Sequence, residues 1–211
     1  MFTSIKPRFI TFEGIDGCGK STQAELLNDY LLHNNIQSTI VREPGGTSIS
    51  EKVRDILLSK INTSMSSRTE ALLMTASRAQ LTKEIIIPQR KTGSWIVSDR
   101  YSDSTLAYQV YGKGVNKNFV DSVHKHILGN TKPDLTFILK AKISKAMQRL
   151  NKRKRKNRYD KFSKNFYNKV QKAFIKIAKQ NKKRYLVGDN SFDTPETEKI
   201  IFNKFISLLK N

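Results

Sequence analysis

The sequence contains little cysteine and no long apolar segment. Cys18 is the single cysteine among 211 residues, so the chain can form no internal disulfide bond, which is typical of proteins in a reducing compartment. No stretch of roughly eighteen apolar residues is present, and the N-terminal residues MFTSIKPRF lack the apolar region of a signal peptide. We therefore expect a cytoplasmic protein that does not insert into a membrane.

Acidic residues are also scarce. The chain has 18 Asp and Glu residues against 39 Lys and Arg residues, which gives a formal net charge of +21. A charge of this size often indicates a polyanionic partner such as nucleic acid, a membrane surface or a phosphorylated substrate. The segment from 140 to 184 holds nineteen Lys or Arg residues and one acidic residue, Asp160. This segment is either a basic lid or nucleic-acid face, or a helix surface of hydrated lysines, and the second interpretation is favoured for most of its lysines.

The chain does contain a complete phosphate-binding motif, FEGIDGCGKST, at residues 12–22. Glycines let the backbone N–H groups approach an anion at the start of a helix, where the helix dipole also favours negative charge. Lys20 would reach the outer phosphates of a nucleotide, and the hydroxyl of Ser21 would bind Mg²⁺. The sequence therefore predicts a nucleotide-binding loop formed by Gly14, Ile15, Asp16, Gly17, Cys18, Gly19, Lys20, Ser21 and Thr22.

Short β-rich segments alternate with helical patterns along the chain. The expected strands are 9–12, 38–41, 95–98, 134–140 and 184–187. The expected helices are 22–32, 48–58, 68–89, 103–111, 118–128, one that starts near 143, 162–180, and a last one after a cap at 194–198. Strands separated by helices predict a single α/β domain over residues 1–211, with a five-stranded parallel sheet flanked by helices.

Charged residues follow three of the expected strands. Ligands of a parallel α/β sheet gather at the carboxyl ends of its strands. Asp16 follows the first strand, Arg42 and Glu43 follow the second, and Asp99 and Arg100 follow the third. Two arginines beside a phosphate loop indicate a second phosphate site. An ATPase needs one phosphate site, whereas a kinase that acts on a nucleoside monophosphate needs two.

Further motifs narrow this interpretation. REPGGT lies at 42–47, an R-x-Q pattern at 78–80, DRY at 99–101, AYQ at 107–109 and PDLTF at 133–137. Together with the phosphate loop, and in this order over essentially the whole chain, they resemble the thymidylate kinase family. The resemblance implies a P-loop NTPase fold and transfer of the γ-phosphoryl of ATP to dTMP with Mg²⁺. It also implies a homodimer, with the helices near 50–60, 68–89 and 103–127 as candidate contact surfaces.

The resemblance assigns roles to single residues. Arg42 and Arg100 would hold the phosphate of dTMP, Arg78 and Gln109 would hydrogen-bond the edge of thymine, and Tyr101 or Tyr108 would crowd the sugar. The implied dTMP-binding residues are Asp16, Arg42, Arg54, Met74, Arg78, Arg100, Tyr101, Thr105, Tyr108 and Gln109. Ser21 would bind Mg²⁺ directly, and Asp99 would bind it through a water molecule.

A mobile basic lid at about 149–161 is the expected source of a catalytic arginine. Some members of the family carry this arginine inside the phosphate loop, but this chain has Gly17 there. Arg149, Arg153 and Arg158 match the lid arginines by position, and we expect Arg153 to be the catalytic one. Arg149 and Arg153 would contact ATP, and the expected catalytic residues are Asp16, Lys20, Asp99, Arg100, Arg153 and Arg158.

The chain departs from the family pattern at three positions. Met74 replaces a Phe that usually stacks on thymine, Asn157 stands where relatives often have Asp, and Asp160 stands where Glu is common. Two alternatives remain open: a kinase for another nucleoside monophosphate, and a basic ATP-dependent nucleic-acid-binding protein. Binding of nucleic acid is not expected, because Phe166 and Phe174 in the basic segment fit a helix core rather than a stacking surface.

The three histidines complete the list of candidate ligands. His33, His124 and His126 show no metal-ligand spacing with one another or with Cys18, so we interpret them as surface residues.

Overall fold

The computed structural model describes residues 8–153, 156–191, 198–200, 202–203 and 206–207. Five parallel strands form one sheet in the order β2-β3-β1-β4-β5. They are β1 (Phe9–Gly14), β2 (Ser38–Arg42), β3 (Trp95–Asp99), β4 (Leu135–Lys140) and β5 (Tyr185–Asp189). The strand positions expected from the sequence are confirmed to within two residues. The cap expected at 194–198 lies largely outside the described residues, although residues 198–200 are helical.

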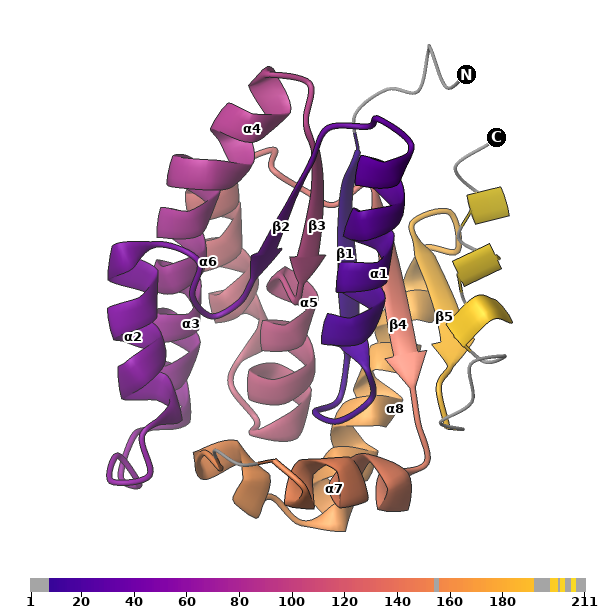
Figure 1. The fold of residues 1–211 in the computed structure, drawn as a ribbon. Helices are drawn as coiled ribbons and strands as arrows, with labels where there is room; N and C mark the ends of the chain where they lie inside the picture. The colour runs from indigo at the N-terminus through magenta and orange to yellow at the C-terminus, as the bar shows by residue number, and fades with distance from the viewer. Residues whose placement is uncertain (1–7, 154–155, 192–197, 201, 204–205, 208–211) are drawn as a thin grey trace.

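Helices cover both faces of the sheet. They are α1 (Lys20–His33), α2 (Ser48–Leu58), α3 (Ser67–Leu81), α4 (Ile87–Lys91), α5 (Ser102–Thr105), α6 (Lys117–Leu128), α7 (Ile143–Asn151) and α8 (Lys164–Gln180), with the π-helical segments η1 (Thr82–Ile86) and η2 (Leu106–Gly112) and the 3-10 segment η3 (Arg158–Lys161). Figure 1 shows α1 in front of the sheet and α8 behind it. Because both faces are covered, all six residues of β1 are buried.

The main core lies between the sheet and these two helices. Leu27 of α1, Ile10 of β1, Phe137 of β4, and Val170 and Phe174 of α8 belong to one buried cluster. This core fixes the phosphate loop between β1 and α1. In Figure 1 the strand arrows point toward the end of the sheet where α7 lies, so α7 and the segment after it are placed beside the carboxyl ends of the strands.

Two of the expected helices contain a π-helical segment. A single helix was expected over 68–89, but α3 ends at Leu81 and η1 separates it from α4. Pro88 has no N–H group that could bond to the carbonyl four residues earlier, and the wider turn of η1 lies just before it. The helix expected over 103–111 likewise consists of α5 and η2, and residues 107–110 are all buried. Such π segments are frequent at functional sites.

No helix in the described ranges is long and apolar enough to cross a membrane.

Candidate active site

The phosphate loop packs directly against α7. Gly17 has a φ of 78°, and a Cβ atom placed on it would lie 2.4 Å from the carbonyl oxygen of Ala146 in α7. Both the positive φ and this contact require glycine. A side chain such as arginine therefore has no room at position 17, because the base of the lid occupies that space.

The loop holds Lys20 and Cys18 in its interior. Lys20 is 6% exposed, and its Nζ donates to the carbonyl oxygen of Ile15 at 2.8 Å. Cys18 is fully buried, and burial raises the pKa of its thiol. A buried, protonated thiol is a weak nucleophile, and the side chain of Cys18 fills space inside the loop.

Ser21 and Asp99 form an oxygen-rich corner beside the loop. The hydroxyl of Ser21 donates to Oδ2 of Asp99 at 2.5 Å. The other carboxylate oxygen, Oδ1, is buried and has no hydrogen-bond partner in the described part of the chain. Hard oxygen ligands of this kind fit Mg²⁺, which normally takes one or two protein oxygens and completes its shell with phosphates and water. Among the described residues, no group of three or more Asp, Glu, His or Cys residues is arranged so that it could hold a metal ion.

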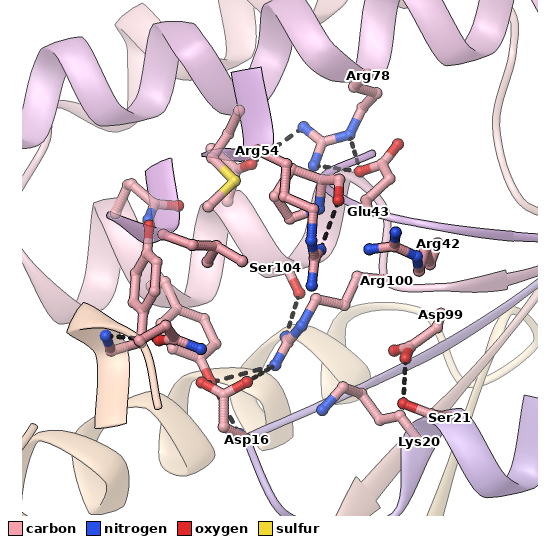
Figure 2. Close-up of a pocket in the computed structure, with 18 of the residues that line it drawn as sticks. Asp16, Lys20, Ser21, Arg42, Glu43, Arg54, Arg78, Asp99, Arg100 and Ser104 are labelled. Atoms are coloured by element: carbon pink, nitrogen blue, oxygen red, sulfur yellow. Dashed lines mark hydrogen bonds and ion pairs between the residues drawn. The ribbon is translucent and has the colours of Figure 1, made fainter. Parts of the chain in front are cut away.

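Arg100 is held at the centre of the site in an unusual backbone conformation. Its φ is 75°, in the left-handed region that few residues other than glycine adopt. Its Nη1 donates to the carbonyl oxygen of Gly14 at 3.0 Å and to Oγ of Ser104 at 2.7 Å, and its Nη2 donates to Oδ1 of Asp16 at 2.7 Å. A strained backbone and several acceptors fix one position of the guanidinium, as is typical of functional sites. Figure 2 shows Arg100 between Asp16 and Ser104.

The Asp16 carboxylate receives donors on both of its oxygens. Besides Arg100, the hydroxyl of Tyr108 donates to Oδ2 of Asp16 at 3.0 Å. Burial alone would raise the pKa of Asp16, but the charges of Arg100 and Lys20 outweigh burial and lower it. Asp16 is therefore a carboxylate at neutral pH, and it faces two cations.

Two further arginines line the same pocket. Arg42 bridges to Glu51, with Nη2 at 3.0 Å from both carboxylate oxygens. Arg54 donates to the carbonyl oxygen of Pro44 at 2.6 Å. Burial and the neighbouring charge of Arg42 lower the pKa of Arg54. Arginines gathered in one pocket are suited to bind a phosphate.

Arg78 lies at another part of the pocket and is 2% exposed. Its Nε donates to Glu43 at 2.7 Å, its Nη1 donates to Thr105 at 3.0 Å, and its Nη2 donates to the carbonyl oxygen of Tyr101 at 2.9 Å. Burial, opposed by Arg78, raises the pKa of Glu43 to about 7. This network fixes the guanidinium of Arg78 against the wall of the pocket, as Figure 2 shows for Arg78 and Glu43.

One pocket thus brings together most of the residues predicted from the sequence. The predicted residues that line it are Asp16, Lys20, Ser21, Arg42, Arg54, Met74, Arg78, Asp99, Arg100, Thr105, Tyr108, Gln109 and Arg153. They come from the loop, from the ends of β2 and β3, from α2 and α3, from α5 and η2, and from the lid.

Known proteins similar to this chain share one description. The family model described as thymidylate kinase matches residues 12–201. The thymidylate kinase of Kosmotoga olearia is 36% identical over 202 residues, covering 96% of this chain and 97% of that protein. The thymidylate kinase of Thermoanaerobacter sp. strain X514 is 40% identical over 199 residues, covering 94% of this chain and 97% of that protein. The chain belongs to the thymidylate kinase family.

A solved structure confirms the fold expected for a thymidylate kinase. The crystal structure of thymidylate kinase from Ehrlichia chaffeensis superposes with a TM-score of 0.77 at 31% identity, covering 98% of this chain and 100% of that chain. The parallel five-stranded sheet with its loop before α1 is therefore a P-loop NTPase fold, as the sequence predicted.

Nine of the predicted site residues lie outside the pocket lining: Gly14, Ile15, Gly17, Cys18, Gly19 and Thr22 of the loop, and Tyr101, Arg149 and Arg158. Tyr101 is fully buried; its ring packs edge-on against Phe9 at 4.9 Å between centroids, and its hydroxyl lies 3.0 Å from that of Thr82. Of the two tyrosines proposed to crowd the sugar, only Tyr108 lines the pocket. Position 101 follows the strained Arg100, and its ring turns into the core instead.

The lid arginines are placed differently from one another. Arg149 donates to the carbonyl oxygens of Gly17 at 2.9 Å and Asn190 at 3.3 Å, behind the loop. Arg158 donates to the buried carboxylate of Glu70 and to the carbonyl oxygen of Leu57. Arg153 lines the pocket itself.

Several residues of the site were missed in the sequence. Glu13 is fully buried at the end of β1, where Oε1 accepts from the N–H of Tyr101 at 2.7 Å and Oε2 accepts from Oγ of Ser104 at 2.6 Å. Burial, and then the nearby carboxylate of Asp103, raise the pKa of Glu13 to about 8. A glutamate inside an apolar strand is a signal that could have been noticed, because Glu is rarely buried without a partner.

His124 corrects the interpretation of all three histidines as surface residues. Its Nε2 lies 3.2 Å from Nη1 of Arg78. Burial and the charge of Arg78 lower the pKa of His124 to about 3, so the ring is neutral and accepts from the arginine. Nothing in the spacing of the histidines indicates this contact, which forms between α3 and α6.

Proposed function

We propose that this chain transfers the γ-phosphoryl group of ATP to dTMP, giving dTDP and ADP, with Mg²⁺ as cofactor. One observation carries the proposal: a single pocket joins the phosphate loop and Lys20 to a group of three arginines and then to Arg78 and Gln109. Two phosphate sites and a polar base site in one pocket are what transfer between two nucleotides requires.

The donor side is built from the loop and the corner beside it. We expect the N–H groups of residues 17–21 and Lys20 to hold the phosphates of ATP. Ser21 and Asp99 would hold Mg²⁺, with Asp99 acting through a water molecule. When bound, the metal neutralises charge on the phosphate oxygens. The chain itself orients the phosphates with fixed N–H donors and a buried ammonium group.

The acceptor side is built from arginines and from η2. Arg100 and Arg42, assisted by Arg54, would hold the phosphate of dTMP, because bidentate arginine contacts match phosphate geometry. Asp16 and Tyr108, which are hydrogen-bonded to each other, would face the deoxyribose. Arg78 and Gln109 would read the edge of thymine, and Met74 would pack on its face as a polarizable substitute for an aromatic ring.

Arg153 is our candidate for the catalytic arginine. It lines the pocket, its side chain is 45% exposed, and it pairs loosely with Asp160 at 3.9 Å. A loosely held cation can move onto the transferred phosphoryl group and stabilise its charge in the transition state. Arg149 and Arg158 donate to fixed acceptors elsewhere, which supports the choice of Arg153.

We also propose that the enzyme is a homodimer. Ile49 and Ile56 of α2 and Leu72 of α3 are large apolar side chains with exposures of 53%, 46% and 44%. These helices belong to the surfaces expected for the dimer. Analytical ultracentrifugation should give twice the mass of one chain, and a monomer at micromolar concentration would contradict the proposal.

Binding of nucleic acid is not supported. Phe174 of the basic segment is fully buried, and Phe166 packs against the core. Neither ring offers the exposed face that stacks on bases.

The deciding experiment measures ADP release with ATP and Mg²⁺ against a panel of dTMP, dUMP, UMP, AMP and single-stranded DNA. We expect dTMP to give the highest kcat/KM. Turnover that is stimulated by DNA but by none of the monophosphates would contradict the proposal, and so would a clear preference for AMP or UMP.

A further inference from the structure

Glu70, in the first turn of α3, is a fully buried carboxylate that no sequence motif singles out. Its Oε1 accepts from Nε2 of Gln109 at 2.7 Å. Lys113 Nζ lies 2.9 Å and 2.8 Å from its two oxygens, and Nη2 of Arg158 donates to Oε2. Burial of a carboxylate is costly unless charged partners surround it, and here two cations compensate it.

The carboxylate fixes which way the amide of Gln109 faces. A carboxylate only accepts hydrogen bonds, so the NH₂ branch of the amide must face Glu70. The carbonyl oxygen occupies the opposite branch of the same planar group. Gln109 is 1% exposed and lines the pocket together with Met74 and Arg78. The branch that points away from Glu70 carries the carbonyl oxygen, and this oxygen is the acceptor that Gln109 can offer the pocket.

Arg78 and Gln109 then present opposite hydrogen-bonding groups. Arg78 can only donate, and its contacts with Glu43, Thr105 and His124 hold it in place. Thymine carries an acceptor at O4 and a donor at N3, whereas cytosine carries a donor at the exocyclic N4 and an acceptor at N3. The acceptor on Gln109 complements the N3–H donor of thymine and mismatches the N3 acceptor of cytosine, and a hydrogen bond from Arg78 to O4 would add to this preference.

We propose that Glu70 is a specificity-determining residue, which locks the amide of Gln109 so that the site accepts thymine and rejects cytosine. The inference rests on the proposed function, because it assumes that a pyrimidine monophosphate binds in this pocket. Glu70 acts through Gln109 and is a positioning residue. If its carboxylate were an amide, position 70 could donate as well as accept, and Gln109 could turn to suit either base.

The test compares kcat/KM for dTMP, dCMP and dUMP in Glu70→Gln. A base that faces a fixed polar group of the wrong hydrogen-bonding type typically has a kcat/KM about 10-fold or more below that of the matched base. We expect the dTMP:dCMP ratio to fall about 10-fold in Glu70→Gln. The dTMP:dUMP ratio should stay the same, because uracil and thymine share the N3 and O4 groups.

Lys113→Met is the matched control. It removes an ion-pair partner of Glu70 but leaves the carboxylate and its bond to Gln109 in place. General loosening of the site should therefore appear in Lys113→Met as equal losses for all three substrates, with an unchanged dTMP:dCMP ratio. Equal losses for all three substrates in Glu70→Gln as well would overturn the inference and leave Glu70 a purely structural role.

Gln109→Met keeps the inference testable if Glu70→Gln does not fold. This variant removes the amide, so its dTMP:dCMP ratio should fall to a similar extent. An unchanged ratio in Gln109→Met would overturn the inference. The unaltered protein separates the two proposals. If it prefers dTMP but the variants keep its dTMP:dCMP ratio, only the inference is refuted. If it does not turn over dTMP, the proposed function and the inference are refuted together.

Discussion

Arg100 and Arg153 line one pocket but differ in how firmly they are held. Arg100 has a left-handed backbone and donates to Gly14, Ser104 and Asp16. Arg153 is half-exposed, and its pairing with Asp160 is long. A fixed arginine is suited to position the acceptor before reaction. A loosely held arginine can change its position, as the role proposed for Arg153 requires.

This difference predicts the effect of Arg153→Ala. We expect kcat to fall about 10³-fold, because a catalytic arginine of this kind stabilises the transition state. KM for dTMP should change by less than about 3-fold, because the interaction is made in the transition state rather than with bound dTMP. Initial rates at saturating ATP measure both values.

Arg158→Ala is the comparison for that variant, since Arg158 donates to Glu70 and Leu57. Its kcat should fall far less. If Arg153→Ala kept its rate while Arg158→Ala lost it, the catalytic arginine would be Arg158.

At the scale of residues, the sequence predicted the groups that belong to motifs and missed their buried partners. Lys20, Arg42, Arg78 and Arg100 stand at recognisable spacings, and all four line the pocket. Glu70 lies in the first turn of a helix, where a glutamate is ordinarily exposed and favours the helix dipole. Its burial depends on contacts with Gln109 and Arg158, which lie 39 and 88 positions further along the chain. No local sequence pattern encodes such contacts.

At the scale of elements, the alternation of β-rich and helical sequence patterns predicted where strands and helices lie. It did not predict which helical segments have π-helical hydrogen bonding. Apolar spacing distinguishes a helix from a strand, whereas α-helical and π-helical segments have nearly the same side-chain pattern over a few residues. The π segment η2 therefore became visible only in the structure. The close packing of α7 against the loop was likewise not predictable, because the contact between Gly17 and Ala146 joins segments far apart in the chain.

Glu13 connects β1 to the segment that begins with Arg100, and its pKa predicts how stability depends on pH. The pKa is about 8 in the folded protein and 4.5 for an ordinary glutamate. Between these values the folded state binds one more proton than the unfolded chain. The free energy of unfolding should therefore fall as the pH rises from about 4.5 to about 8, by up to about 1.4 kcal/mol per pH unit from this group.

Glu13→Gln should remove that part of the pH dependence. Urea unfolding at about pH 5.5, 6.5 and 7.5 measures it in both proteins. Glu43, whose pKa is raised to about 7, contributes in the same direction but is present in both proteins, so the difference between them reports Glu13 together with the neighbouring carboxylate of Asp103. If the free energy of unfolding changed with pH in the same way in both proteins, Glu13 would not take up a proton on folding in this range.

At the scale of the whole molecule, the sequence indicated the fold class, but alternation alone does not give the order of the strands. The order β2-β3-β1-β4-β5 places β1 at the centre, with β3 and β4 as its neighbours. The loop after a central strand is thereby surrounded by the ends of β3 and β4 and by α7. The charged residues that follow the strands meet there. Their meeting at the carboxyl ends of the strands is the part of the site that the sequence could predict.

The net charge of +21 predicts how the stability of the whole molecule depends on salt. Excess charge of one sign destabilises the compact state by self-repulsion, and salt screens exposed charges over a Debye length of about 10 Å at 0.1 M. The Tm should therefore rise by a few degrees between about 20 mM and about 300 mM NaCl, which corresponds to about 1 kcal/mol for a chain of this size. Scanning calorimetry measures the shift, and choline chloride at the same ionic strength controls for specific binding of sodium. A Tm that stays constant or falls in both salts would mean that ion pairs such as Arg184 with Asp103 contribute more to stability than the repulsion costs.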